Sequence, residues 1–176
     1  MIRIQYTALP KDLAFSDLEG ELAVTRTVLE RIPETHFTWK PNERSMSLGS
    51  LALHVADMPG WITATLDRDE LDTADGPRPP AELKKSQELL DRFDRNAAAA
   101  RDAVARFDMA NHDKSWSLRS GEQVVVTRPR SLVNRIWCAN HLVHHRGQLC
   151  LYLRLLNEPV PTVYFNTADD PTWVFA

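Results

Sequence analysis

Apolar residues recur along four segments of the chain at the spacing of an amphipathic helix. The first segment repeats them at alternating intervals of three and four, with one threonine among them, at Phe15, Leu18, Leu22, Thr25, Leu29 and Ile32. This spacing places these residues on one helix face and predicts that the face is buried. Pro33 follows directly, and the helix is expected to stop there.

The second helical segment is predicted to begin at Ser47, because serine favours the N-cap position. His54 lies on its expected buried face among apolar neighbours, namely Leu48, Leu51, Val55 and Met58. Pro59-Gly60 is expected to kink or interrupt this helix. The pattern then resumes with Trp61, Ile62 and Leu66. Residues 67–80 are acidic and rich in proline, which predicts a surface connection.

The third helical segment is expected to start around Pro80, since proline is favoured in the first turn. Its apolar stripe consists of Leu83, Leu90, Phe93, Ala97, Ala100, Val104 and Phe107. Between Lys114 and Thr127 the period changes, with Trp116 and Leu118 alternating with polar residues before Ser120-Gly121. This change predicts a short β-hairpin.

The fourth helix is expected from about Arg130 to Leu156. Together these patterns predict an all-α fold, a four-helix bundle with a short β-hairpin between helices 3 and 4. The whole chain, residues 1–176, is expected to form a single domain. The tail is rich in aromatic residues, so it is expected to pack on the bundle or on a second subunit; these residues are Tyr164, Phe165, Trp173 and Phe175.

Composition and charge exclude several classes of partner. The net charge of −3 gives no electrostatic basis for nucleic-acid binding. The sequence contains no run of about 18 apolar residues, and its first six residues lack the apolar core of a secretory signal. We therefore expect no membrane partner and a cytoplasmic location. Cys138 and Cys150 lie in the same predicted helix, roughly 18 Å apart along its axis, too far for a disulfide, and are expected to be small, reduced, buried side chains.

The segment from His141 to Gln148 carries the clearest chemical signal. His141 and His145 are four residues apart, so on a helix their imidazoles share one face and can bind one metal ion. A lone histidine at position 54 would be a hydrogen-bonded core residue more often than a ligand. Three inward imidazoles change that reading, because burying each without a shared purpose costs desolvation. Three nitrogens with an open fourth position suit a catalytic zinc, nickel or cobalt site.

Other polar residues fall on the same stripe of the fourth helix. At about 100° per residue, Asn134, Cys138, Gln148 and Tyr152 lie within a narrow sector around His141. We predict Gln148 and Tyr152 as catalytic side chains: Gln148 would orient a ligand or a bound water, and Tyr152 would contact substrate. Asp57 could orient a ligand too, although ordinary helix-surface polarity explains it and Gln148 as well. His144 lies at the edge of the stripe, as a surface neighbour or an alternative ligand.

These residues together resemble the DinB/YfiT-like family of metal-dependent proteins. The resemblance is carried by Trp39-Lys40-Pro41, by the segment 45–49, by Leu53-His54-Val55-Ala56, and above all by the segment 141–149 with Tyr152-Leu153-Arg154. It implies a four-helix bundle that holds a divalent metal at His54, His141 and His145, and a homodimer. Relatives include bacillithiol S-transferases and mycothiol-dependent isomerases. Residues 165–170 depart from the family pattern, which leaves substrate specificity open.

The function predicted on this basis is a metal-dependent enzyme that activates a low-molecular-weight thiol for attack on a small-molecule electrophile, as an S-transferase or isomerase does. Nickel or zinc is the expected metal. A metal-hydroxide hydrolase would use the same ligands. A non-catalytic metal-binding protein of stress response, which uses its apolar tail for interaction, is a third interpretation. In a fourth interpretation, the histidines are core residues of the bundle and bind no metal.

Overall fold

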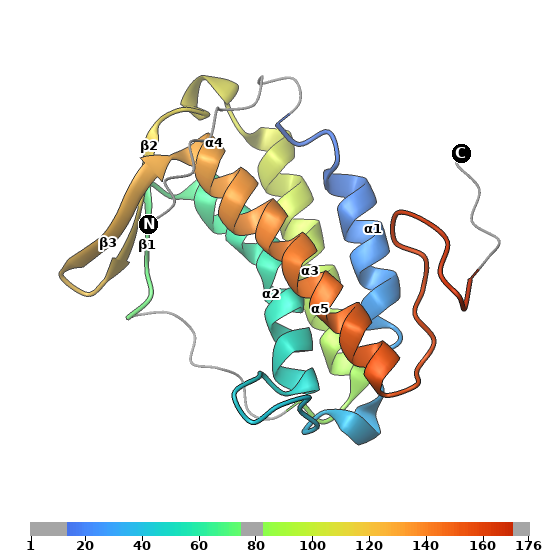
Figure 1. The fold of residues 1–176 in the computed structure, drawn as a ribbon. Coiled ribbons are helices and arrows are strands. Elements are labelled where there is room, and N and C mark those ends of the chain that lie inside the picture. The colour runs from blue at the N-terminus through green and yellow to red at the C-terminus, as the bar shows by residue number, and fades with distance from the viewer. Residues whose placement is uncertain (1–13, 75–82, 171–176) are drawn as a thin grey trace, which may run out of the picture.

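Four long helical segments lie side by side in the computed structural model, with a small sheet at one end (Figure 1). The structure describes residues 14–74 and 83–170. The long helices are α1 (Leu18–Leu29), α2 (Leu48–Asp67), α3 (Ser86–Arg106) and a fourth composed of α4 (Arg130–Val133), η4 (Asn134–Asn140) and α5 (His141–Leu155). The strands are β1 (Glu70–Asp72), β2 (Ser115–Ser120) and β3 (Gln123–Pro129), and the short 3-10 turns are η2 (Glu34–His36) and η3 (Met109–Asn111).

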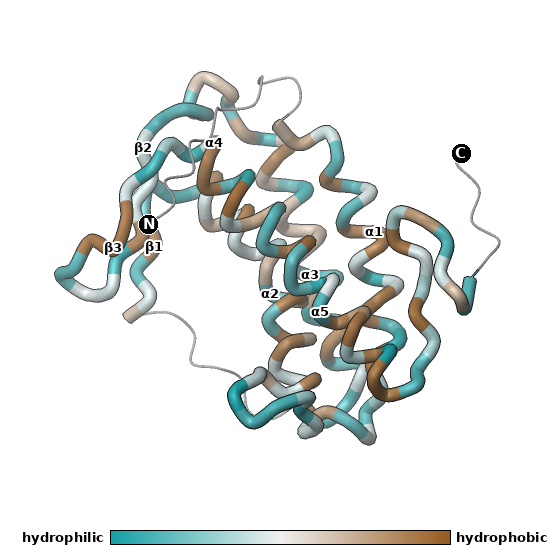
Figure 2. The backbone as a smooth tube through the Cα atoms, viewed as in Figure 1, coloured by the Kyte–Doolittle hydropathy of each residue, from teal (hydrophilic) through white to brown (hydrophobic). Residues whose placement is uncertain are grey.

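The main core lies between the helices, where their apolar stripes meet. Polar and apolar positions alternate along each helix, as expected when one face is buried (Figure 2). From the first predicted stripe, Leu22, Thr25, Leu29 and Ile32 are buried. From the third, Phe93, Ala97 and Ala100 are buried. These observations confirm the helical periodicity read from the sequence.

Helix α2 runs through Pro59 as one helix, so of the expected kink or interruption the interruption is wrong. The N-terminus is as predicted: the Ser47 hydroxyl oxygen accepts a hydrogen bond from the backbone N–H of Ser50 at 3.2 Å. Pro59 is buried, and Asn96 on α3 donates to the carbonyl of Ala56 at 2.9 Å. Proline lacks the N–H of a helical hydrogen bond, and the helix continues past it where it packs on α3.

Helix α3 begins at Ser86, later than the predicted start at Pro80, which lies outside the described residues. Its first turn is held by groups from the segment after α1. The Ser86 N–H donates to the Glu34 carboxylate at 2.8 Å, and its hydroxyl donates to the carbonyl of Ile32 at 3.1 Å. A distant glutamate therefore satisfies a free N–H at this helix end, which local sequence patterns do not reveal.

The sheet has three strands in the order β1-β2-β3, so the prediction of a lone two-stranded hairpin between helices 3 and 4 is wrong. Strands β2 and β3 pair antiparallel, and Gly121 turns between them with φ of +60°. Strand β1 pairs parallel with β2 and lies in the segment 67–80, so the prediction of a plain surface connection there is wrong. With three residues, β1 is too short for any periodicity to show.

The fourth helix spans Arg130–Leu155, close to its predicted bounds, but residues 134–140 form a π-helical turn. A helical wheel drawn at about 100° per residue does not hold through such a turn. The tail after α5 folds back beside α1 (Figure 1), where the Tyr164 hydroxyl donates to the Glu21 carboxylate at 2.8 Å. Phe165 is 64% exposed, and Trp173 and Phe175 lie outside the described residues.

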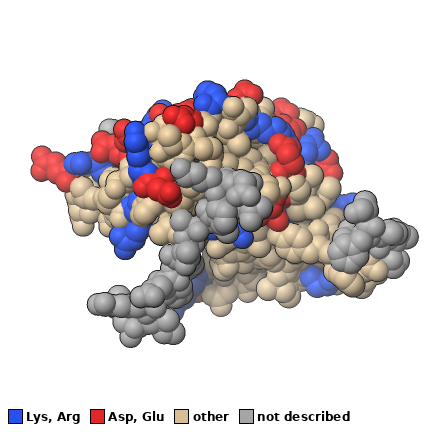
Figure 3. Space-filling model, turned by 90° about the horizontal axis from the view of Figure 1, so that it is seen from above, with Lys and Arg blue, Asp and Glu red and all other residues tan. Residues whose placement is uncertain are grey.

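Charged residues of both signs intermingle over the face shown in Figure 3. This agrees with the small net charge of −3. Among the helices the structure describes, none is long and apolar enough to cross a bilayer.

Candidate metal centre

Three imidazoles meet where α2 and α5 face each other. The ring centroids of His54 and His145 are 4.7 Å apart, those of His54 and His141 are 5.2 Å apart, and those of His141 and His145 are 4.5 Å apart. One ring nitrogen from each residue can be chosen so that the three atoms lie within 4.8 Å of one another. The residues predicted as ligands are therefore brought together, two from one turn of α5 and one from α2.

Hydrogen bonds to the other ring nitrogens fix which atoms are free to bind a metal. His141 Nδ1 lies 3.3 Å from the carbonyl oxygen of Trp137, which only accepts, so Nδ1 is the protonated nitrogen. His145 Nδ1 lies 2.7 Å from Gln148 Oε1 and donates to it. Both Nε2 atoms then carry lone pairs, and they face each other at 2.8 Å. With these tautomers, both Nε2 atoms can serve as ligands to one metal ion.

Burial favours the neutral form of two of these imidazoles. Desolvation lowers the pKa of His54 to about 4, and the charges of His145 and His141 lower it further, while Asp57 opposes them. Burial also lowers the pKa of His141, with the charge of His145 as the next cause. Neutral imidazoles are the form that binds metal. The donor set therefore fits a divalent ion that prefers nitrogen ligands.

Gln148 is the one predicted polar neighbour that contacts a ligand directly. Its side-chain oxygen accepts the hydrogen bond from His145 Nδ1, the ring nitrogen that faces away from His141. Asp57, which was expected as a possible orienting group, instead binds Arg92 on α3, with its Oδ2 2.8 Å from Nη2. Asn96 lies 3.4 Å from its Oδ1. Asp57 thus fastens α2 to α3.

Tyr152 lies in the core, 8% exposed, with its hydroxyl donating to the carbonyl of Met46 at 3.3 Å. Its ring packs edge-on against Trp39, 5.5 Å between centroids. It therefore joins α5 to the loop before α2. His144 is exposed, and its ring lies 4.9 Å from that of His145, so it is a surface neighbour of the three-histidine group and not a member.

Asn134 and Cys138 do not continue the histidine stripe. Cys138 lies beside Thr65 on α2, with 4.0 Å between sulfur and hydroxyl oxygen, in a second apolar cluster. The π-helical turn changes the direction in which both side chains point, which explains why the simple wheel misplaced them. The Cys138 thiol is protonated, because burial raises its pKa to about 12.

Trp61 forms a wall of the site that sequence reasoning did not assign. Its ring lies edge-on to the rings of His54 and His141, with centroids 5.9 Å and 5.7 Å away. It is 37% exposed, so this wall of the site is partly accessible to solvent. A usable signal existed: Trp61 is seven residues after His54, two helical turns along the same face.

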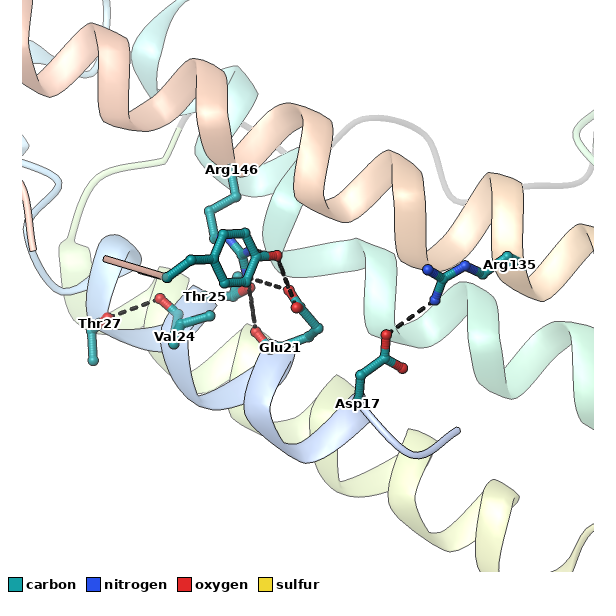
Figure 4. A network of polar contacts seen from close by, with 8 residues as sticks. Asp17, Glu21, Val24, Thr25, Thr27, Arg135 and Arg146 are labelled. Carbon is teal, nitrogen blue, oxygen red and sulfur yellow. Dashed lines mark hydrogen bonds and ion pairs between the residues drawn. The ribbon is translucent and has the colours of Figure 1, made fainter. Parts of the chain in front are cut away.

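A buried arginine beside the site was also missed. Arg146 is 1% exposed, and its guanidinium lies 2.7 Å from the Glu21 carboxylate and 3.1 Å from the Thr25 hydroxyl. Figure 4 shows Arg146 beside Thr25 and Glu21. The Tyr164 hydroxyl completes the group. This network fastens α5 to α1 through the residue that follows His145. The signal for it was Thr25, a polar residue in an otherwise apolar stripe.

Comparisons with known proteins agree with this fold. The model of the DinB family matches residues 8–173. A DinB-like protein from Bacillus cereus ATCC 10987 superposes with a TM-score of 0.69 at 18% identity, covering 91% of this chain and 100% of the other. The DinB-like protein YjoA of Bacillus subtilis superposes with a TM-score of 0.68 at 16% identity. The match covers 85% of this chain and 96% of the other.

A third solved structure, described as a putative member of the DinB family from Exiguobacterium sibiricum 255-15, gives a TM-score of 0.60 at 19% identity. It covers 86% of this chain and 95% of the other. At these identities the likeness shows the fold alone. No curated protein matches the sequence at a significant level.

Proposed function

This chain belongs to the DinB family, and from its three-histidine group we propose that it is a metalloenzyme that activates a low-molecular-weight thiol. One divalent ion, nickel or zinc, would be held by His54, His141 and His145. The observation that supports this most directly is the pair of His141 and His145 rings, whose Nε2 atoms lie 2.8 Å apart. Their protonated Nδ1 atoms are held by acceptors on the opposite side of each ring.

Such an ion, when bound, is a Lewis acid that lowers the pKa of a coordinated thiol. Three protein ligands leave a position for that thiol. The sulfur would then form a bond to an electrophilic carbon, and its proton would pass to water. In a transferase the leaving group departs with its electron pair, and in an isomerase the adduct later expels the thiol.

The chain's own residues would position this chemistry. Gln148 holds the Nδ1–H of His145, which fixes the ring so that Nε2 points to the shared site. Trp61 covers the imidazoles and limits access of water. Cys138 offers no competing nucleophile, because burial raises its pKa to about 12. Tyr152 supports the loop that carries Trp39, and its predicted contact with substrate is part of this proposal.

The proposal includes a small-molecule substrate, a homodimer as the family resemblance implies, and a cytoplasmic location. A reducing compartment suits the free cysteines Cys138 and Cys150.

The metal site is tested by elemental mass spectrometry on untagged protein. We expect about one equivalent of nickel or zinc in the wild type, lost in His54→Ala and in His145→Ala. His144→Ala is the matched control, because His144 is an exposed neighbour on the same helix, and it should keep its metal. Retained stoichiometric metal in His145→Ala would reject the ligand assignment.

The thiol is tested separately, with metal-loaded protein and a panel of small electrophiles, with and without bacillithiol, mycothiol or cysteine. Product that forms only with a thiol supports the proposal. Product that forms equally well without one favours hydrolysis by a metal-bound hydroxide. Full metal occupancy without turnover across the panel favours a non-catalytic role.

A further inference from the structure

A cleft of about 390 Å³ lies between α2 and α3, which run side by side (Figure 1). Small-molecule sites commonly have volumes of roughly 300 to 1,000 Å³. The lining includes Asp57, Gly60 and Trp61 of α2 and Arg92, Arg95 and Asn96 of α3. The spacing of three and four residues within each set places its members on one helix face. Two facing helix surfaces therefore form a cleft large enough for a small molecule.

Trp61 is shared between this cleft and the candidate metal centre. It lines the cleft, and its ring lies edge-on to the rings of His54 and His141, with centroids 5.9 Å and 5.7 Å away. Asp57, which also lines the cleft, follows His54 by three residues on α2. A molecule held in the cleft would therefore lie beside the metal centre, with Trp61 as the common wall.

The cleft carries an excess of positive charge. Among the described residues that line it, the charged ones are Asp57, Arg92 and Arg95. The Asp57 carboxylate is already bound by Arg92, with Oδ2 2.8 Å from Nη2 and Oδ1 accepting a second hydrogen bond from Nε. Asp57 and Arg92 therefore neutralise each other, and Arg95 supplies the remaining charge.

Arg95 makes no hydrogen bond or ion pair with the part of the chain that the structure describes. Asp94, its neighbour in sequence, does not neutralise it, because that carboxylate binds Arg26 of α1 at 2.9 Å. Arg95 is exposed, so its N–H donors are accessible to a ligand. The planar guanidinium presents these donors in a fork that matches the two oxygens of a carboxylate.

We propose that this cleft binds the carboxylate group of a substrate of the metal centre, with Arg95 as its ionic partner. The inference rests on the proposed function and adds the class of substrate to it. One excess positive charge matches a monoanion, whereas a phosphate dianion would keep an uncompensated charge. Trp61, Ala64 and Leu71 form the apolar part of the lining, so the carboxylate is attached to an apolar or aromatic group.

The binding test uses benzoate as the probe, benzamide as its neutral analogue and phenyl phosphate as the competing anion, each titrated into protein as purified. ¹H–¹⁵N NMR of the indole groups follows binding, and the spectrum of Trp61→Phe assigns the Trp61 signal. We expect benzoate to shift the Trp61 signal saturably and to bind about tenfold more tightly than benzamide. Trp39, which packs on Tyr152 and does not line the cleft, should stay unmoved. Tighter binding of phenyl phosphate than of benzoate would overturn the carboxylate assignment.

Arg95→Gln removes the charge, so it should weaken benzoate binding about tenfold and leave benzamide binding unchanged. Arg101→Gln is the matched control, because Arg101 lies on the same helix but pairs with Glu19 and does not line the cleft. It should bind benzoate as the wild type does. Ala64→Phe should fill the cleft and weaken the binding of both probes. Equal benzoate affinity in wild type and Arg95→Gln, or a Trp61 signal that benzoate does not shift, would overturn the proposal.

Turnover by metal-loaded protein identifies the reactant that carries the carboxylate. One arm compares 3-mercaptopropionate with 3-mercaptopropionamide, each with benzyl chloride as a neutral electrophile. The other arm compares 4-(chloromethyl)benzoate with its amide, each with 2-mercaptoethanol as a neutral thiol. Arg95→Gln should raise the KM of the carboxylate reactant about tenfold in one arm and leave kcat unchanged. Unchanged KM values in both arms would show that the cleft does not hold a substrate.

Failure of this inference can be told apart from failure of the proposed function. His145→Ala should lose its metal and still bind benzoate, because none of the three histidines lines the cleft. Loss of benzoate binding in His145→Ala would show that the carboxylate binds the metal ion, and would reject the cleft assignment alone. Metal-loaded protein that binds benzoate through Arg95 but shows no turnover would reject the proposed function while supporting the carboxylate site.

Discussion

His145 donates its Nδ1–H to Gln148 Oε1 at 2.7 Å, across one turn of α5. The bond sets the tautomer of His145 and directs its Nε2 toward His141. Loss of such a hydrogen bond from a histidine that binds metal commonly lowers the metal affinity by roughly 10- to 100-fold.

Gln148→Leu should therefore weaken metal binding by roughly 10- to 100-fold while the three ligands remain. Gln148→Glu should keep high affinity, because a carboxylate also accepts the Nδ1–H. Competition with a chromogenic chelator measures both constants. Equal affinities for wild type and Gln148→Leu would show that this hydrogen bond does not prepare the site.

The grouping of the three histidines could be predicted because its signal is local or lies on a regular helix face. His141 and His145 are one turn apart on α5, and His54 lies among apolar residues of α2. Periodicity likewise predicted the long helices and the buried positions of the α1 stripe. Each of these inferences needs only the repeat of one helix, which the sequence contains in full.

Other features depend on partners far along the chain. Arg146 looks like a surface residue until Glu21, 125 positions earlier, is placed beside it. Strand β1 exists only because β2 lies next to it, with Leu71 opposite Leu118. The π-helical turn shifts the helix phase without changing residue types, so the wheel that placed Cys138 near the histidines failed.

The buried pair of Arg146 and Glu21 leads to a prediction about stability. Their side chains are 1% and 15% exposed, and removing one partner of a buried pair leaves the other charge without compensation. Glu21→Leu should therefore lower the free energy of unfolding by about 3 to 5 kcal/mol, measured by urea denaturation.

Glu19→Leu is the matched control on the same helix. Glu19 pairs with Arg101, but the two side chains are 68% and 45% exposed. Water screens such a pair, so this change should alter stability by no more than about 1 kcal/mol. Equal losses for the two variants would mean that burial does not distinguish the pairs.

The lowered pKa of His54 predicts acid sensitivity of the metal-free protein. Burial, and then the charges of His145 and His141, lower the pKa from 6.5 in the unfolded chain to about 4 in the folded one. Between these values the unfolded state binds a proton that the folded state rejects, so stability falls as pH drops from about 6.5 to about 4.

Urea denaturation of chelator-treated protein across this range measures the effect. In His54→Gln the free energy of unfolding should fall less steeply with decreasing pH. The difference in slope corresponds to the uptake of up to about one proton on unfolding. Well above pH 6.5 His54 should contribute no slope, since its imidazole is then neutral in both states. An identical pH profile for wild type and His54→Gln would contradict this account.

Two helical glycines should respond in opposite ways to the same substitution. A Cβ on Gly147 of α5 would meet no atom within 4 Å, whereas one on Gly49 of α2 would lie 3.0 Å from the carbonyl oxygen of Phe37 and 3.1 Å from its Cβ. The Gly49 N–H also donates to that carbonyl at 2.9 Å, so the loop cannot withdraw without losing a hydrogen bond. Gly147→Ala should stabilise the fold by up to about 1 kcal/mol through helix propensity, and Gly49→Ala should destabilise it by about 1 to 3 kcal/mol through overpacking. Urea denaturation of the two variants checks the signs, and stabilisation by both would show that the Phe37 loop yields freely to α2.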